Sequence, residues 1–170
     1  MSLAESILRR TTLDRLALFI SSAAYGTVLV LAALAVIKGI HISVGYGAEL
    51  IAGVGVATWV AHVYAELLGE HVHRQLPLTH AEVRASFVDG LPILGSPVLP
   101  GLVLMLGKLE SVSEQSARTA AILVAIAQLL AIGVLVGVIA PSRRGALWIF
   151  AGVTAGVGLA VVVITTWLGH

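Results

Sequence analysis

Ionisable side chains gather at the end of the second long apolar stretch of the sequence. His62, Glu66, Glu70 and His73 recur at the three- and four-residue spacing that places side chains on one face of a helix. An imidazole and a carboxylate one turn apart can share a divalent ion such as Zn, Fe or Mn. They can also pass a proton between them. These four residues are therefore the candidate ligands of a metal ion or the candidate carriers of a proton.

A second interpretation of the same residues is structural. His62 and Glu66 would then hydrogen-bond each other and a neighbouring helix, while the residues from Glu70 onward would be solvated. We favour a functional role for the first pair because ionisable groups at membrane depth are costly and usually serve function.

Two further polar residues fall in apolar surroundings. Asp89 precedes a stretch with three prolines and three glycines (Asp89–Gly101), and Gln128 stands alone in the middle of a later apolar run. Prolines interrupt a regular helix, and broken helices in transporters coordinate substrates with freed backbone groups. We assign Asp89 and Gln128 to a possible ion pathway. The competing interpretations are a simple kink and an interhelical hydrogen bond from Gln128.

Motifs of several enzyme classes do not occur. The zincin signature requires a glutamate directly after the first histidine, whereas Val63 follows His62. The inverted signature requires a histidine where Leu67 stands. The sequence contains no phosphate-binding loop, nucleophile elbow or dinucleotide fingerprint. It also contains no cysteine, which excludes disulfides and thiol chemistry.

The elements that position these residues follow from composition. The chain of 170 residues is 58% hydrophobic and 11% charged, with a mean hydropathy of +1.02. A helix needs roughly 20 apolar residues to cross a bilayer. Five apolar stretches stand out: Leu16–Ile37, Ala48–Gly69, Leu91–Gly107, Thr119–Ala140 and Ala146–Leu168. The sequence predicts an all-α polytopic membrane protein, a single bundle of about five transmembrane helices with the third broken by proline and glycine.

Basic residues predict the orientation of this bundle. Seven arginines fall on one side of the five spans (Arg9, Arg10, Arg15, Arg74, Arg84, Arg143 and Arg144), and Lys38, Lys108 and Arg118 fall on the other. The positive-inside rule then predicts a cell-membrane protein with its N-terminus cytoplasmic and its C-terminus outside. Residues 1–15 are expected to form a short interfacial segment or a solvated tail on the cytoplasmic side.

Local signals add detail to the connections. Thr79 and Glu82 have the spacing of a capping box, which predicts a short helix from His80 towards Val88. Ser111 or Ser113 can cap the fourth span. Glycine pairs at spacing four, Gly133 with Gly137 and Gly152 with Gly156, allow close approach of helices within or between chains.

The leading hypothesis is a small membrane protein that binds and translocates a cation, either a proton or a divalent metal, at His62 and Glu66. Because five short helices leave little room for a pathway, we expect a homo-oligomer in the lipid bilayer. One alternative is a membrane-embedded metal-dependent enzyme acting on a lipid-soluble substrate. Another is a non-catalytic assembly subunit. The net charge of +1 and the lack of a basic patch indicate no nucleic-acid partner.

Overall fold

The structure is a computed structural model that describes residues 3–39, 42–74 and 77–139, together with 152–154, 156–161, 163 and 167. In these parts of the chain all regular structure is helical. The elements are α1 (Leu3–Gly39), α2 (Val44–Arg74), α3 (His80–Asp89), α4 (Leu91–Gly95), α5 (Val98–Met105), the 3-10 turn η1 (Leu106–Lys108) and α6 (Glu114–Ile139).

Four of the helical segments are long and apolar enough to cross a membrane. They are Arg15–Ile37, Val44–His73, His80–Lys108 and Glu114–Ile139. The all-helical architecture predicted from the sequence is therefore confirmed, and the segments are consistent with a multi-pass membrane protein. Most of the expected fifth span lies outside the described residues. Its described part includes Gly158, which lies against Leu129 of α6 and Leu31 of α1.

The first helix is longer than the apolar stretch it contains. α1 runs without interruption for 37 residues, so residues 3–15 extend the first span. The sequence analysis had expected a separate interfacial segment or a tail. No proline or glycine occurs between Leu3 and Tyr25, and nothing in the local sequence ends the helix.

The third span begins about ten residues earlier than its apolar composition suggested. The capping box is present: the Thr79 side chain accepts from the Glu82 backbone N–H, and the Glu82 carboxylate accepts from the Thr79 N–H at 2.8 Å. This box starts α3, which leads directly into α4 and α5. The predicted short helix is confirmed, but it belongs to the third span.

The prolines break this span without removing its helical character. Pro92 lies in the first turn of α4, Pro97 immediately precedes α5, and Pro100 is the third residue of α5. A proline in the first turn of a helix sacrifices no intrahelical hydrogen bond, because the N–H groups there have no partner within the helix. The sequence predicts that these prolines interrupt a regular helix, and the structure has two short helices there, with α5 beginning at Val98.

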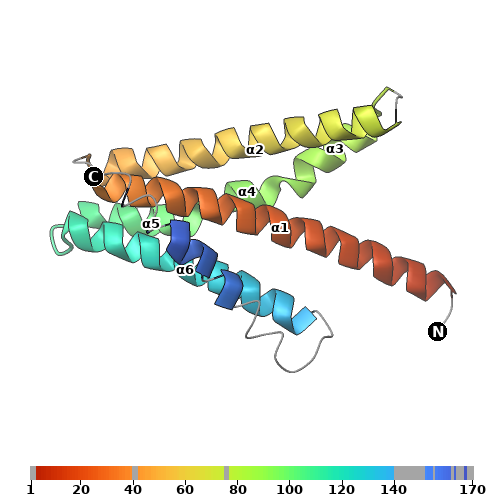
Figure 1. Cartoon of the computed structure of the whole chain (residues 1–170). Coiled ribbons are helices and arrows are strands. Elements are labelled where there is room, and N and C mark those ends of the chain that lie inside the picture. Colours follow the sequence, from red (N-terminus) through yellow and green to blue (C-terminus); the bar gives the residue numbers. More distant parts are fainter. Residues whose placement is uncertain are drawn as a thin grey trace.

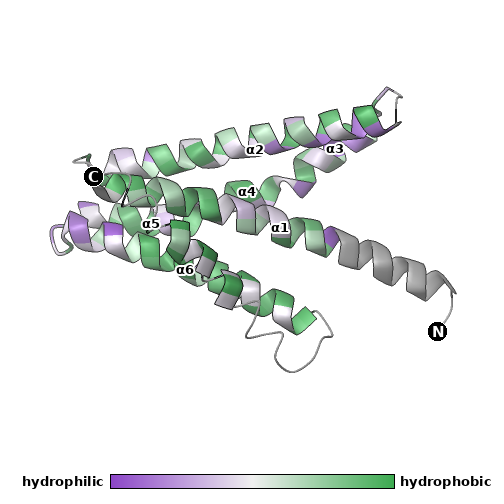
Figure 2. Ribbon diagram, viewed as in Figure 1, coloured by the Kyte–Doolittle hydropathy of each residue, from purple (hydrophilic) through white to green (hydrophobic). Residues whose placement is uncertain are grey.

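The helices form a bundle with two different ends (Figure 1). The α1–α2 and α5–α6 connections lie together at one end, which we call the closed end. The start of α1 and the α2–α3 connection lie at the other, which we call the open end because α1 and the α2–α3 pair diverge towards it in Figure 1. Figure 2 shows apolar residues along most of the bundle, with hydrophilic residues at the two ends and in α3.

The hydrophobic core belongs to the closed end. It is built from the last turns of α1, the first turns of α2, the end of α5 and the first half of α6: Val30, Leu31, Leu34, Ile37, Val44, Ile51, Leu104, Ala121, Ile122, Ala125 and Leu129. Leu31, Ile51, Leu104 and Leu129 are completely buried. This packing fixes α1 and α2 relative to each other at the closed end. Both helices continue from there towards the open end.

Candidate functional site

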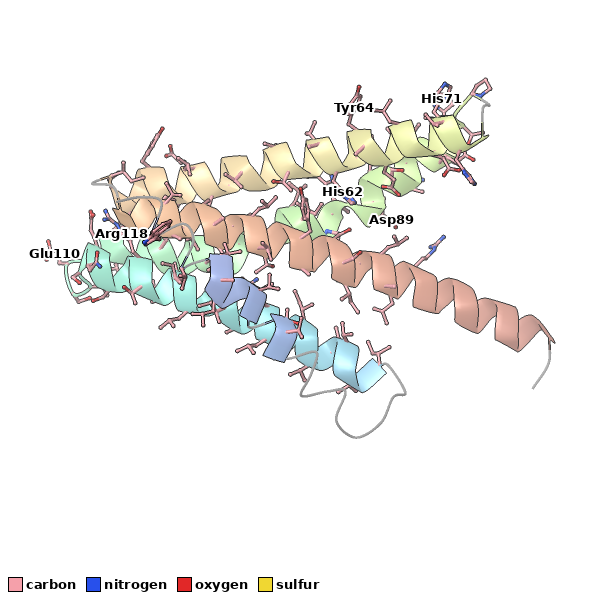
Figure 3. The ribbon with its side chains drawn as sticks, in the orientation of Figure 1. His62, Tyr64, His71, Asp89, Glu110 and Arg118 are labelled. Carbon is pink, nitrogen blue, oxygen red and sulfur yellow. The ribbon has the colours of Figure 1, made fainter. Side chains whose placement is uncertain are left out.

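His62 lies on the face of α2 that is turned towards α1, whereas Tyr64 and His71 point to the opposite side of the helix (Figure 3). The His62 ring lies beside the Tyr25 ring of α1, with centroids 6.4 Å apart and planes inclined by 36°. His62 is half-buried and Tyr64 is 64% exposed. The spacing in the sequence predicted one polar face of α2. In the structure that face lies against the protein, and the opposite face points outward.

A cavity of about 510 Å³ separates α1 and α2 at this level. Its lining includes His62, Tyr25 and the hydroxyl residues Ser21 and Ser22. Ser21 donates its hydroxyl proton to the Leu18 carbonyl at 2.9 Å, which leaves its oxygen lone pairs available as acceptors. The histidine therefore opens onto a space lined partly by groups that can hydrogen-bond to water or to a proton carrier.

Glu66 follows His62 by one helical turn. Its side chain is half-buried, and its Oε2 is shielded from solvent and has no hydrogen-bond partner among the residues that the structure describes. A carboxylate oxygen that is neither hydrated nor paired is costly, and a bound proton or cation would remove that cost. Among the residues of α2, this oxygen gives the clearest indication of a site for a proton or a cation.

The same face of α2 packs on the third span further towards the closed end. A Cβ on Gly55 would lie 2.9 Å from the Pro97 ring. One turn later, the Trp59 indole N–H donates to the Phe87 carbonyl at 3.3 Å, and the two rings meet edge to face at 5.3 Å. The face of α2 that carries the polar residues therefore contacts protein over its central turns.

Asp89 lies within the third span, whereas the apolar stretch predicted from the sequence begins at Leu91. It is the last residue of α3, ten residues into the third span. Its neighbour Gly90 lies against the Trp59 indole, where a Cβ would come within 3.0 Å of Cδ1. Asp89 is consequently at the level of the turns that carry Trp59 and His62, not at the level of Glu66 and Glu70. Figure 3 shows Asp89 and His62 on the side of the α2–α3 pair that faces α1.

The outer members of the predicted set are placed differently. Glu70 is half-buried and engaged in an interaction, whereas His73 is exposed. Among the residues that the structure describes, no group of three or more His, Asp or Glu side chains is close enough to hold a metal ion. The structure does not gather His62, Glu66, Glu70 and His73 into a multidentate set, and metal binding stays a prediction.

Gln128 does not join His62. It lines a separate cavity of about 350 Å³ between α1, α4 and α6, together with Thr27 and Ser96. The α1 residues of the two cavities lie on largely opposite sides of that helix, because Ser21, Ser22 and Tyr25 differ from Ala23 and Thr27 by roughly half a turn. Gln128, which the sequence assigned to the ion pathway, and His62 thus open onto different spaces.

Sequence reasoning missed one feature of the site and one feature of the closed end. The first is the contribution of α1: Ser21, Ser22 and Tyr25 form a polar cluster within an apolar span, and that cluster was a readable signal. The second is Arg118, which is buried in α6, pairs with Glu114 at 3.0 Å and donates to the carbonyl of Ile42. The four-residue spacing of Glu114 and Arg118 indicated the ion pair, but nothing local indicated the contact with the α1–α2 connection.

Comparisons of the chain with protein-family models, curated proteins and solved structures find no match. The function of the chain is therefore inferred from its residues and their geometry.

Proposed function

We propose that this chain is a membrane protein that binds and translocates a small cation at His62 and Glu66, and that a proton fits the site best. The observation that carries the proposal is the shielded Oε2 of Glu66, which has no hydrogen-bond partner in the described parts of the chain and lies one turn from a histidine that lines a cavity. Protonation of this carboxylate would remove the buried charge, and His62 would exchange the proton with the cavity.

The surroundings favour a proton over a divalent metal. Zinc sites use three or four protein ligands, whereas His62 and Glu66 provide two. Proton transfer needs only successive hydrogen-bonding groups, and the cavity supplies the hydroxyls of Ser21, Ser22 and Tyr25. Asp89 extends the polar series on the side of the α2–α3 pair that faces α1. The metal hypothesis would require a second copy of the chain to supply the remaining ligands.

The proposal includes a membrane orientation. The open end would face the cytoplasm, because the predicted topology places the N-terminus and the α2–α3 connection there. Protons would then reach His62 from the cytoplasm on the side where α1 diverges from α2 and α3. We retain the homo-oligomer as part of this proposal, since four or five helices form only a small bundle.

Proton flux into proteoliposomes tests the proposal. The purified protein is reconstituted with a pH-sensitive dye inside, and a potassium diffusion potential drives proton entry. We expect Glu66→Gln and His62→Gln to reduce flux to the level of empty liposomes, because His62→Gln removes the exchangeable proton site at the cavity and Glu66→Gln removes the one a helical turn away. Glu49→Gln is the matched control: it removes an exposed carboxylate from the same helix and should leave flux unchanged.

Two other measurements separate the alternatives. Flux of Zn²⁺ or Mn²⁺ into dye-loaded liposomes, lost in the same variants, would replace the proton with a metal. Stoichiometric iron or zinc retained through purification would favour the enzyme hypothesis. Proton flux that is the same in wild type, Glu66→Gln and His62→Gln would remove these residues from the mechanism and overturn the proposal.

A further inference from the structure

We propose that the second cavity, which we call the Gln128 cavity, binds a lipid-soluble alcohol or phenol. It is separate from the His62 cavity and takes no part in the cation chemistry proposed above. Its walls include Ala23 and Thr27 of α1, Ser96 between α4 and α5, and Gln128 and Ala131 of α6. Three observations support this proposal: the volume of the Gln128 cavity, a polar group in its lining that lacks a hydrogen bond, and the neutral character of the described lining residues.

The Gln128 cavity exists because the third span is broken and because small residues line the space beside it. α4 packs on α1 and α2, and among the described elements it makes no contact with α6. α1 therefore forms the floor of the cavity, with the α4 side and α6 as its walls. Ala23, Gly95 and Ala131 contribute little side-chain volume. The resulting cavity of about 350 Å³ falls within the usual range of small-molecule sites.

The unsatisfied group is the Gln128 amide. Its Oε1 is shielded from solvent and accepts no hydrogen bond from the residues described by the structure. The two hydroxyls in the same lining do not supply the missing donor. Thr27 donates to the Ala23 carbonyl at 2.8 Å, and Ser96 donates to the Ile93 carbonyl at 2.6 Å. Each hydroxyl has thus used its only proton, and all three side chains offer acceptor oxygens.

A ligand hydroxyl complements this arrangement. It donates to the amide oxygen and accepts from the amide N–H₂, so it satisfies the side chain whichever way the amide is turned. No ionisable residue is among the described residues that line the cavity, so a charged ligand would meet no counter-charge from them. The remaining lining is mainly apolar and suits a hydrocarbon body. A neutral amphiphile dissolved in the membrane, anchored by one hydroxyl, is the class that fits.

Photolabelling in lipid vesicles tests this site. The probe is a long-chain alcohol with a diazirine on its chain, and the comparison probe is its methyl ether, which keeps the oxygen acceptor but lacks the O–H donor. We expect the alcohol to label peptides of α1 and α6 around the cavity about five- to tenfold more than the ether, the usual worth of one hydrogen bond to an otherwise unsatisfied group. In Gln128→Leu, a substitution of similar size, the ratio should fall to about one.

A steric pair of variants provides an independent readout. Ala131→Trp fills the cavity and should abolish labelling by both probes. Ala127→Trp adds the same side chain one turn earlier on α6, at an exposed position outside the cavity lining, and should leave labelling unchanged. Equal labelling by alcohol and ether in the wild type, or an unchanged ratio in Gln128→Leu, overturns the proposal. Undiminished labelling in Ala131→Trp would overturn it as well.

Discussion

α1 and α2 run through both ends of the bundle but pack on different partners in each. At the closed end, the last turns of α1 and the first turns of α2 meet α5 and α6 in a continuous apolar core, and Leu34 and Leu104 are nearly or fully buried. Towards the open end, α2 leaves α6 and is covered mainly by α3. There, buried apolar residues give way to His62 beside a cavity, with Glu66 one turn further along α2 and Asp89 at the end of α3.

This difference indicates how a small helical protein can hold ionisable groups at depth. Packing at one end fixes the relative positions of α1 and α2, and the other end then needs few apolar contacts of its own. In a bilayer, lipid would offer no hydrophobic incentive for helices to associate, so close van der Waals packing would supply the stability. The variants below test whether stability and polar chemistry are divided in this way.

The largest effect is expected in the core. Leu104→Ala removes a completely buried side chain and leaves a cavity, so the free energy of unfolding should fall by about 2 kcal/mol or more. Leu102→Ala is the matched control from the same helix, because Leu102 is 62% exposed and its truncation should change stability little. Unfolding by denaturing detergent, followed by circular dichroism, measures both. Equal losses in the two variants would refute the closed end as the source of stability.

A smaller effect is expected where α1 meets the broken third span. A Cβ on Gly26 would lie 2.6 Å from Ser96 Oγ and 3.0 Å from Ile93 Cα. Gly26→Ala should therefore destabilise the protein by about 1–3 kcal/mol through overpacking. Gly53→Ala provides the contrast, since a Cβ there meets nothing within 4 Å and alanine is the better helix former. The same unfolding assay applies, and a neutral Gly26→Ala would show that α1 and α4 separate easily.

The smallest effect concerns the hydrogen bond that joins α2 to α3. Trp59→Phe keeps an aromatic ring against Phe87 but removes the N–H donor to its carbonyl, with an expected cost of about 0.5–1.5 kcal/mol. Hydrogen exchange should accelerate in α3 and leave the core amides of α6 unchanged, because the bond is local to the open end. Tyr64→Phe, on the exposed face of α2, should alter neither. Acceleration throughout the bundle would instead couple the two ends.

The sequence by itself determined the helical class and several helix boundaries, because their causes are local. Apolar length predicts spanning helices, Thr79 and Glu82 form their capping box within one turn, and Ser113 accepts from the Ser116 N–H at the start of α6. The spacing of His62 and Glu66 likewise placed both on the protein-facing side of α2. The prediction of a broken third span depended on the same kind of local reasoning from its prolines.

Only the tertiary structure decided which residues share a space. The rotation of each helix about its axis places Gln128 in a cavity apart from His62 and brings Asp89 level with Trp59. It also leaves Gly152 and Gly156 facing open space, while Gly158 makes the close helix contact. These outcomes follow from how side chains interlock across helices that are distant in sequence. Such interlocking depends on all partners together, so no single stretch of residues determines it.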